Sequence, residues 1–264
     1  MRVDVYLAAA GYVPSRKKAQ DLIKEEAVRI DGKTVRKASE TVNESVEHNV
    51  VIEQVFKYVS RGGMKLEAAL DAFSVNVNGK KVVDVGASTG GFTDCLLCRG
   101  AKKVYAVDAG IGQLHEKLRS DSRVVCIERF NARELTSEIT EGKCDAAVAD
   151  VSFISQTYIL PRIPAVLVEN GLLISLIKPQ FEAGRGALNK QGVVRHVKDR
   201  IFAVSRVLEA ASAVGLTPLK LAPSPILGGD GNEEFLALFR RDASANITID
   251  IEKTVKEGAV TGSK

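Results

Sequence analysis

The sequence lacks the features that mark secreted, zinc-binding or membrane proteins. It has only four cysteines in 264 residues, and none shows the paired spacing of a disulfide scaffold. A zinc site would need a second pair beside Cys95 and Cys98, but Cys126 and Cys144 are isolated. No signal peptide precedes the first helical pattern, and no apolar run approaches the ~18 residues of a membrane span. We therefore expect a cytoplasmic protein without a bound metal.

The chain also lacks a strong excess of charge of one sign. Its formal net charge is +4, with 45% hydrophobic and 27% charged residues. These values are typical of a globular protein with a buried core, and they permit a polyanionic partner without requiring one. Length alone does not decide between one large domain and two smaller ones.

Residues 1–59 have the pattern of a small α+β domain. Apolar residues at helical spacing predict a helix from about Val3 to Gly11 and a second helix capped by Ser15. Strands are expected around residues 28–30 and 49–55, with a turn at Asp31-Gly32. Ten Lys and Arg stand against nine Asp and Glu over residues 1–60. The charges are unevenly spread, and the domain can still present a basic face. The basic residues that precede most of the acids of the later strand are Arg2, Arg16, Lys17, Lys18, Arg29, Lys33, Arg36 and Lys37.

From residue 81 onward, apolar strands alternate with helices. Strands are expected at 81–85, 103–107, 124–127, 145–149 and 172–177, with a last pair at 217–222 and 234–239. Helices are expected at 92–99, 113–119, 156–168 and 197–214. This alternation indicates an α/β domain over residues 60–242, with a doubly wound, mostly parallel Rossmann-like sheet. Residues 243–264 have little core pattern and are expected to form a loosely attached tail.

The segment from Val82 to Phe92 runs from an apolar strand through a Gly/Ser/Thr turn directly into a helix. Such a turn presents backbone N–H groups beside the carboxyl end of a strand, where doubly wound sheets bind nucleotides. It differs from the dinucleotide fingerprint because Ser88 replaces the second glycine. Asp84 would repel a pyrophosphate but suits the cationic sulfonium and amino groups of S-adenosylmethionine. Asp108, at the end of the next strand, can accept hydrogen bonds from both ribose hydroxyls.

The sequence therefore predicts an adenosyl-cofactor site at this edge of the sheet. Asn131, after the third strand, is at a position where it could contact the adenosine. The full set of expected cofactor contacts is Asp84, Gly86, Ala87, Ser88, Thr89, Gly90, Gly91, Phe92, Asp108, Asn131 and Asp150.

The same turn also fits the nucleophile elbow of α/β hydrolases. Ser88 lies between two glycines at the required spacing, and Asp150 and His196 follow in the hydrolase order. However, the turn follows the first strand of the domain, which leaves no upstream loop for an oxyanion hole. His196 also stands at a charged helix start. We therefore favour the adenosyl cofactor over the hydrolase alternative.

Up to about residue 240 the chain closely resembles the TlyA family of ribosomal RNA 2′-O-methyltransferases, also called the haemolysin A family. The N-terminal part is similar to an RNA-binding module first known from a small-subunit ribosomal protein. Its marks are Arg2-Val3-Asp4, Ser15-Arg16, Ala19, Leu22-Ile23 and Val28-Arg29-Ile30-Asp31-Gly32. The remainder resembles an FtsJ-type methyltransferase, and its marks are residues 58–66, the Gly86 turn, and residues 150–155, 178–182 and 231–235.

The resemblance implies S-adenosylmethionine-dependent methylation of a ribose 2′-hydroxyl of ribosomal RNA, with a cytidine as target and ribosomal subunits as partners. It also implies a catalytic set of Lys65, Asp150, Lys178 and Glu234. We expect Lys178 to take the hydroxyl proton, oriented by Asp150, and Lys65 to supply a second positive charge. Glu234 would fix a lysine or the ribose hydroxyl. A lysine serves as such a base only when burial or a second ammonium group lowers its pKa well below the reference ~10.4.

The resemblance further implies phosphate contacts in the N-terminal domain, namely Arg2, Arg16, Lys17, Arg29 and Lys33. Lys57 and Arg61, in the connecting segment, are candidates for coupling RNA docking to the catalytic domain. Two other functions stay open, a non-catalytic ribosome-assembly factor and a membrane-active haemolysin. The intact catalytic set argues against the first, and the lack of a spanning or strongly one-sided apolar helix gives no mechanism for the second. The subunit that is methylated and the oligomeric state are not fixed by the sequence.

Overall fold

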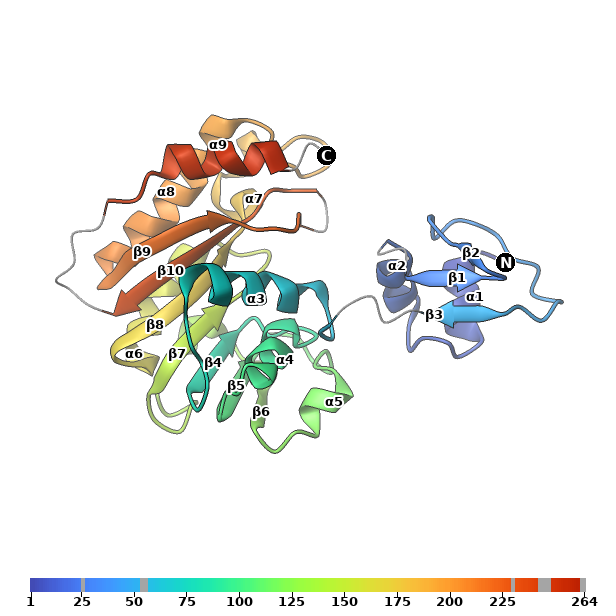
Figure 1. Ribbon diagram of the computed structural model, residues 1–264, viewed down its shortest axis with the longest axis horizontal. Coiled ribbons are helices and arrows are strands. Elements are labelled where there is room, and N and C mark those ends of the chain that lie inside the picture. Colours follow the sequence, from blue (N-terminus) through green and yellow to red (C-terminus); the bar gives the residue numbers. More distant parts are fainter. Residues whose placement is uncertain (25–26, 53–56, 229–230, 242–247, 262–264) are drawn as a thin grey trace. The chain divides into compact units, whose positions relative to one another are not determined.

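The computed structural model describes residues 1–24, 27–52, 57–228, 231–241 and 248–261. The chain divides into two units, Met1–Lys57 and Tyr58–Lys264. Each unit has its own hydrophobic core, and the elements are labelled in Figure 1.

The first unit packs two helices against a small antiparallel sheet. The helices are α1 (Val3–Ala9) and α2 (Arg16–Lys24), and the strands are β1 (Val28–Ile30), β2 (Lys33–Thr34) and β3 (Val50–Ile52), in the order β2-β1-β3. The Ser15 hydroxyl accepts a hydrogen bond of 3.2 Å from the backbone N–H of Lys18 and so caps α2 as expected. The strand expected at 49–55 is present at β3, and residues 53–55 lie outside the described part.

The second unit is built on a seven-stranded sheet in the order β6-β5-β4-β7-β8-β10-β9. Its strands are β4 (Lys81–Val85), β5 (Lys103–Val107), β6 (Val124–Ile127), β7 (Cys144–Ala149), β8 (Leu167–Ile177), β9 (Leu216–Pro223) and β10 (Phe235–Arg241). The strands from β6 to β8 are parallel, and β10 is antiparallel to both of its neighbours. The expected doubly wound, mostly parallel sheet is therefore confirmed.

Helices cover both faces of this sheet, which explains why its strands are apolar at nearly every position. Val82 points to one face together with α3 (Arg61–Phe73), α4 (Gly91–Cys98) and α5 (Glu116–Arg119). Val83 points to the other face, which is covered by α8 (Val197–Ala213) and the short turns after β7 (Figure 1).

The prediction of one helix over residues 156–168 was wrong. The segment forms two 3-10 turns, η2 (Gln156–Tyr158) and η3 (Leu160–Arg162), and a single α turn, α6 (Ile163–Val166), before β8 begins at Leu167. Proline occupies one of the first two positions of both η3 and α6. Pro161 and Pro164 cannot donate the backbone hydrogen bonds that a continuous helix needs, so the helix is divided. The helix expected at 113–119 is likewise reduced to α5.

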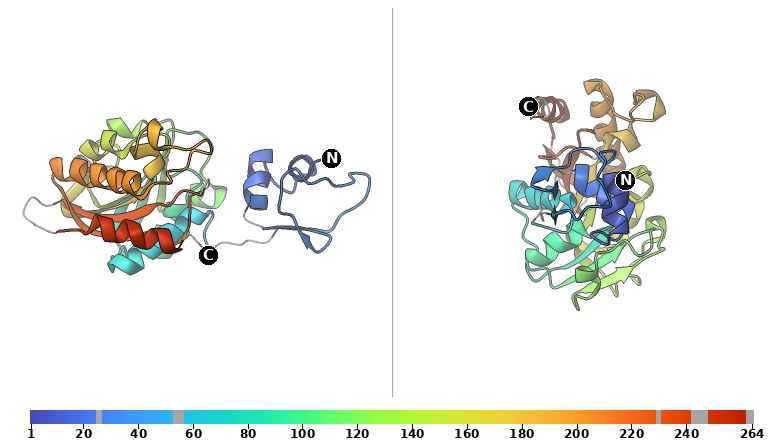
Figure 2. Two further views of the ribbon diagram at one scale, coloured as in Figure 1. Left: turned by 90° about the horizontal axis from the view of Figure 1, so that it is seen from above. Right: turned by 90° about the vertical axis from the view of Figure 1, so that its right-hand side faces the viewer.

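The tail expected after residue 242 also differs from the structure. Residues Ile251–Thr261 form α9, which lies alongside α8 and β9 (Figure 2). Val255 of this helix is fully buried, and a Cβ at Gly258 would lie 3.2 Å from Pro223 and 3.5 Å from the ring of Phe235. A packed helix therefore replaces the loosely attached tail over this range.

Candidate active site

The carboxyl ends of β4, β5 and β7 meet at the point where the chain reverses its direction of travel across the sheet. From β4 the chain moves outward to β5 and β6, whereas β7 lies on the other side of β4 and leads to β8. Such a switch point is where open α/β sheets form a crevice for ligands. Gly86, Asp108 and Asp150 each follow directly after one of these three strands, so the fold brings the predicted turn and both acids together.

The turn after β4 is packed so closely that two of its positions require glycine. Gly86 has φ +85°, and a Cβ there would lie 2.7 Å from the carbonyl oxygen of Asp150. Gly90 has φ +96°, and a Cβ there would lie 2.2 Å from Leu118. Any larger residue at either position would combine backbone strain with a steric clash. The glycines thus let the backbone of the turn reach the crevice.

Asp84 is a buried carboxylate with one oxygen unsatisfied. Oδ2 accepts a 2.6 Å hydrogen bond from the hydroxyl of Thr93, whereas buried Oδ1 has no hydrogen-bond partner among the described residues. Burial, opposed by hydrogen bonds from Thr93 and assisted by the charges of Asp150 and Asp108, raises the pKa of Asp84 to about 7. A cationic ligand would satisfy this oxygen and stabilise its ionised form. The residues present therefore fit the positively charged portion of S-adenosylmethionine.

Asp108 and Asn131 make local contacts in the structure. The Asp108 carboxylate accepts hydrogen bonds from the backbone N–H groups of Ser88, at 2.8 Å, and Gly110, at 2.6 Å. Each of its oxygens keeps a further lone pair for a ribose hydroxyl. The side-chain oxygen of Asn131 accepts from the backbone N–H and Nε of Arg133, both at 3.1 Å. Asn131 thus caps the 3-10 turn η1 (Ala132–Glu134), and only its amide nitrogen remains for a ligand.

The Gly-Gly pair at the start of α3 brings that helix against the start of α4. A Cβ at Gly63 would lie 2.4 Å from the ring of Tyr58, and one at Gly91 would lie 2.9 Å from the backbone nitrogen of Gly63. A Cβ at Gly62 would lie 3.6 Å from Phe92 and 3.8 Å from the carboxylate of Asp150. This close approach places the first turn of α3, and with it Lys65, beside the crevice.

The structure brings the four expected catalytic residues together as two ion pairs, of which Lys65–Glu234 is buried on both sides and Lys178–Asp150 is partly exposed through Asp150. Lys65 Nζ pairs with Glu234 Oε2, and these side chains are 9% and 3% exposed. Lys178 Nζ lies 2.5 Å from Asp150 Oδ1. Glu234 and Lys178 stand at the same end of the sheet because Phe235 of β10 pairs with Ile177 of β8.

The two ion pairs also influence each other electrostatically. Burial raises the pKa of Glu234, the positive charges of Lys65 and Lys178 oppose that rise, and the negative charge of Asp150 adds to it. The four groups therefore form one coupled cluster.

Two residues of this site, Ser152 and Phe153, lie in the segment 150–155 that marks the resemblance but were not expected as site residues. The Ser152 hydroxyl accepts a 2.8 Å hydrogen bond from Lys178 Nζ. Phe153 is 92% exposed and has φ +64°, and its ring centroid lies 5.3 Å from that of Phe181. A large aromatic side chain in a strained backbone region and almost wholly in solvent indicates a contact surface. In the sequence, the feature that could have indicated Phe153 is its position three residues after Asp150.

The residues of the hydrolase alternative do not meet. The Ser88 hydroxyl donates to the side-chain oxygen of Gln113 at 3.2 Å, and Asp150 pairs with Lys178. His196 is exposed at the start of α8. A Ser-His-Asp site requires hydrogen bonds between these side chains, so the structure gives the hydrolase no support.

In the first unit, the buried carboxylate of Asp4 holds two of the expected RNA contacts. It accepts hydrogen bonds from Nε of Arg2 at 2.9 Å, Nε of Arg16 at 2.8 Å and the amide of Gln20 at 2.7 Å. The Arg2 and Arg16 side chains remain 46% and 54% exposed. Lys17, Arg29, Lys33 and Lys57 are also exposed, and Arg61 is half-buried. Asp4 therefore fixes two guanidinium groups at the surface.

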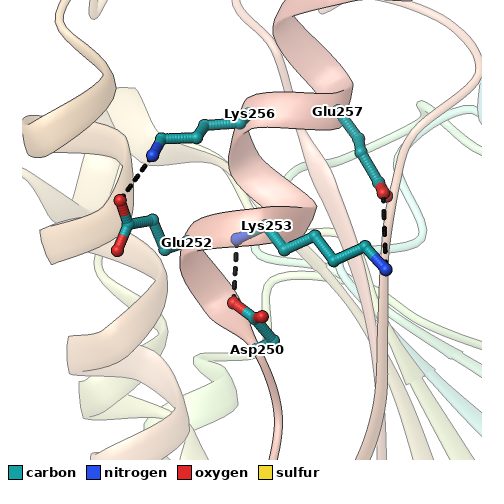
Figure 3. Close-up of a pocket in the computed structure, with 5 residues that line it drawn as sticks. All are labelled: Asp250, Glu252, Lys253, Lys256 and Glu257. Atoms are coloured by element: carbon teal, nitrogen blue, oxygen red, sulfur yellow. Dashed lines mark hydrogen bonds and ion pairs between the residues drawn. The ribbon is translucent and has the colours of Figure 1, made fainter.

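A depression beside α9 contains none of the expected site residues. It is lined by Asp250, Glu252, Lys253, Lys256 and Glu257 (Figure 3). Lys256 lies 2.5 Å from Glu252, and Lys253 lies 4.0 Å from Glu257. Both lysines are therefore paired, and the carboxylate of Asp250 accepts a 2.9 Å hydrogen bond from the backbone N–H of Lys253.

The residues that the structure describes contain no group of three or more His, Cys, Asp or Glu side chains arranged to hold a metal ion. None of the described helices is long and apolar enough to cross a membrane.

Comparisons with known proteins match both units. Residues 58–241 match the model of the FtsJ-like methyltransferase family, and residues 1–48 match the S4 domain. A solved structure of an S-adenosylmethionine-dependent methyltransferase from Listeria monocytogenes shares only the fold of the second unit. It has a TM-score of 0.50 and 16% identity, covering 69% of this chain and 99% of that one.

Several relatives are similar over nearly the whole chain. The 16S/23S rRNA (cytidine-2′-O)-methyltransferase TlyA of Mycobacterium tuberculosis is 42% identical, covering 90% of this chain and 89% of the relative. Hemolysin A of Brachyspira hyodysenteriae is 44% identical, covering 90% and 99%. A solved structure from Streptococcus thermophilus, assigned as a hemolysin, has a TM-score of 0.80 and 38% identity, covering 99% and 96%.

Proposed function

This chain belongs to the FtsJ-like methyltransferase family and, with its S4 domain, to the TlyA group within it, and from that membership we propose that it methylates the ribose 2′-hydroxyl of a cytidine in ribosomal RNA. S-adenosylmethionine is the methyl donor. The S4 unit (Met1–Lys57) binds RNA, and the methyltransferase unit (Tyr58–Lys264) carries the chemistry. Because ribosomal subunits are the substrate, we assign the protein to the cytoplasm.

The observation that carries this proposal is the cluster of two ion pairs at the cofactor edge of the sheet. Asp150 follows β7 and Lys178 follows β8, and these two residues form an ion pair. Asp84 lies in β4, the strand next to β7. The charge on Asp150 is close enough to raise the pKa of Asp84. The expected proton acceptor therefore lies beside the residues that fit the methyl donor.

Lys178 is the residue that we assign to the hydroxyl proton. The cofactor supplies an electrophilic methyl group, and the ribose oxygen must lose its proton as it forms the new bond to carbon. Lys178 Nζ contacts Asp150 and Ser152. In its neutral form the amine can donate its two N–H groups to these side chains, and its lone pair is then left to accept the proton of the 2′-hydroxyl. Asp150 and Ser152 thus hold Nζ in place for the transfer of the proton.

Lys65 and Glu234 form the second ion pair of the site. The ammonium group of Lys65 supplies a positive charge next to Lys178, and Glu234 holds this ammonium group in position. We assign Lys65 to the ribose or phosphate of the target nucleotide. Phe153, which projects from the same edge, presents a flat face on which an unstacked base can lie.

We expect the binding of S-adenosylmethionine to become tighter as pH rises through 7. In the protein without cofactor, the raised pKa keeps Asp84 protonated up to about pH 7, whereas the same group in an unfolded chain ionises near pH ~3.9. Because a cationic ligand needs the ionised form, binding below pH 7 must release this proton. The dissociation constant should therefore be about tenfold larger at pH 6 than at pH 8. Calorimetry in buffers of different ionisation enthalpy measures both the affinity and the proton release.

The control for this experiment is Asp84→Asn, which keeps the shape of the side chain but cannot ionise. It should bind the cofactor more weakly and lose the change in affinity between pH 6 and 8. A wild-type affinity that is flat over this range would show that Asp84 does not face the cationic part of the cofactor.

We expect Asp4→Asn to weaken the binding of ribosomal RNA, although the substitution removes a negative charge from an RNA-binding unit. Asp4 orders the guanidinium groups of Arg2 and Arg16, and the neutral amide cannot accept their hydrogen bonds equally well. Filter binding to ribosomal subunits at fixed salt should show a loss of about three- to tenfold. If charge alone governed binding, Asp4→Asn would bind more tightly, and that result would contradict the positioning role. Unchanged S-adenosylmethionine affinity would show that the methyltransferase unit is intact.

A further inference from the structure

The loop that joins α7 (Pro179–Glu182) to α8 is basic. It contains the 3-10 turn η4 (Arg185–Ala187). Arg185, Lys190 and Arg195 are exposed, as is Lys198 in the first turn of α8. Residues 183–198 include no aspartate or glutamate. Within the described residues these four side chains have no ion pair or hydrogen bond, so their charges are available to a partner.

A buried asparagine gives this loop a defined shape. Asn232 is 1% exposed. Its side-chain oxygen accepts a 2.9 Å hydrogen bond from the backbone N–H of Val194, and its amide donates to the carbonyl of Gly192 at 3.0 Å. Within the loop, the Asn189 oxygen accepts from the backbone N–H groups of Gln191, at 2.8 Å, and Val193, at 2.9 Å. The basic side chains therefore project from an ordered backbone.

A second buried contact ties the loop to the start of β10. Arg200 is 6% exposed, and its guanidinium group donates to the carbonyls of Val194, at 3.2 Å, and Arg195, at 3.1 Å. The same group lies 3.4 Å from the carboxylate of Glu233. Asn232 and Glu233 are the two residues before Glu234, so both anchors place the loop next to one catalytic ion pair.

The other end of the loop is held beside the second catalytic ion pair. Glu182, the last residue of α7, is 1% exposed. Its carboxylate accepts hydrogen bonds from the hydroxyl of Ser155, at 2.5 Å, and the backbone N–H of Gln156, at 2.7 Å. These contacts join α7 to the loop that carries Ser152, which in turn contacts Lys178. The basic loop is therefore anchored at both ends next to the residues that perform the chemistry.

We propose that residues 185–198 form a docking surface for the phosphate backbone of the RNA segment that carries the target nucleotide. The inference rests on the proposed function and adds to it a second RNA contact, made by the methyltransferase unit itself. Exposed Lys and Arg side chains on an ordered backbone neutralise phosphates and fix the register of a nucleic acid, while base contacts specify sequence. Bound in this way, the strand would be held with its ribose facing Lys178.

The test is the triple variant Arg185→Gln/Lys190→Gln/Arg195→Gln, assayed in the full chain. Its matched control is Lys80→Gln/Lys102→Gln/Lys143→Gln, which removes three charges just before β4, β5 and β7, at the opposite edge of the sheet. Equilibrium binding to ribosomal subunits is measured over a salt series, together with KM and kcat for methyl transfer. Cofactor affinity, expected to be unchanged in both variants, checks that the unit is folded.

We expect the loop variant to raise Kd and KM for subunits by about tenfold or more at 0.1 M salt, with kcat within about twofold of the wild type. The slope of log affinity against log salt should fall by about two, the value for the loss of three phosphate contacts. The control variant should change each quantity much less. Equal behaviour of the two variants would overturn the docking surface.

The binding measurement separates this inference from the proposed function. A wild type that binds subunits but does not methylate them, while the loop variant loses salt-dependent binding, would refute the reaction and support the surface. A wild type that methylates RNA while the loop variant keeps its full affinity would refute the surface and support the reaction.

Discussion

Replacing Lys178 by alanine is expected to reduce methyl transfer to ribosomal RNA by about 10³-fold or more, while S-adenosylmethionine still binds with near wild-type affinity. A positioned general base contributes about 10²- to 10⁴-fold to a rate, and the substitution also leaves Asp150 without its ion-pair partner. Single-turnover transfer of a labelled methyl group to ribosomal subunits measures the chemical step directly. Retained transfer would show that another group takes the proton.

The substitution Lys178→Arg distinguishes a base from a fixed positive charge. Arginine keeps the charge and can pair with Asp150, but it cannot be deprotonated in a protein. We therefore expect this variant to be nearly as inactive as Lys178→Ala. If it kept more than about a tenth of the wild-type rate, the role of Lys178 would be electrostatic, and the assignment of the base would be wrong.

The second large effect concerns the buried pair of Lys65 and Glu234. The substitution Glu234→Leu leaves the Lys65 ammonium group buried without its partner, because both side chains are less than a tenth exposed. Removing one partner of a buried ion pair costs about 3–5 kcal/mol of unfolding free energy. The double variant Lys65→Met/Glu234→Leu removes both charges and should recover most of that loss. It should nevertheless be unable to methylate RNA, since it lacks the charge of Lys65.

Because the chain has two units, unfolding must be followed in the methyltransferase unit alone. Hydrogen exchange of β10 during urea titration at pH 7 reports on that unit. The double variant thus separates stability from chemistry. Methyl transfer by a stable double variant would show that the pair is only structural. A double variant as unstable as Glu234→Leu would show that an unpaired buried charge is not the cause of the lost unfolding free energy.

The strands around the cofactor turn were predictable because local signals define them. The observed bounds of β4, β5 and β6 coincide with the expected 81–85, 103–107 and 124–127. Each is a short apolar run with turn-forming or charged residues on both sides, and each lies in a sheet that is covered on both faces. Asp108 and Asp150 each follow another expected strand of the parallel sheet, and this placed the candidate site at one edge of the sheet.

Other features depend on contacts that the local pattern does not contain. The apolar spacing of residues 156–168 is helical, but Pro161 and Pro164 divide the segment into short turns. Helix α9 has few apolar residues, and it forms where Val255 and Gly258 pack against the unit. Phe153 combines a positive φ with an exposed ring, and both depend on the conformation of the folded loop.

The pairing within the catalytic cluster also depends on the folded chain. Lys65 and Glu234 are 169 residues apart in the sequence. They meet because the glycines at the start of α3 allow a close helix approach and because β10 pairs with β8 in one register. The family resemblance supplied these residues as a set, and the geometry of their contacts came only from the structure.

The most direct test of the proposed function is the chemical identity of the methylated nucleotide. Ribosomal subunits lacking the modification are incubated with the protein and labelled S-adenosylmethionine, and their RNA is digested to nucleosides for chromatography and mass spectrometry. The proposed function predicts that the label is found in 2′-O-methylcytidine. Label in a base-methylated nucleoside, or no label from a protein that binds both the cofactor and the subunits, would contradict it.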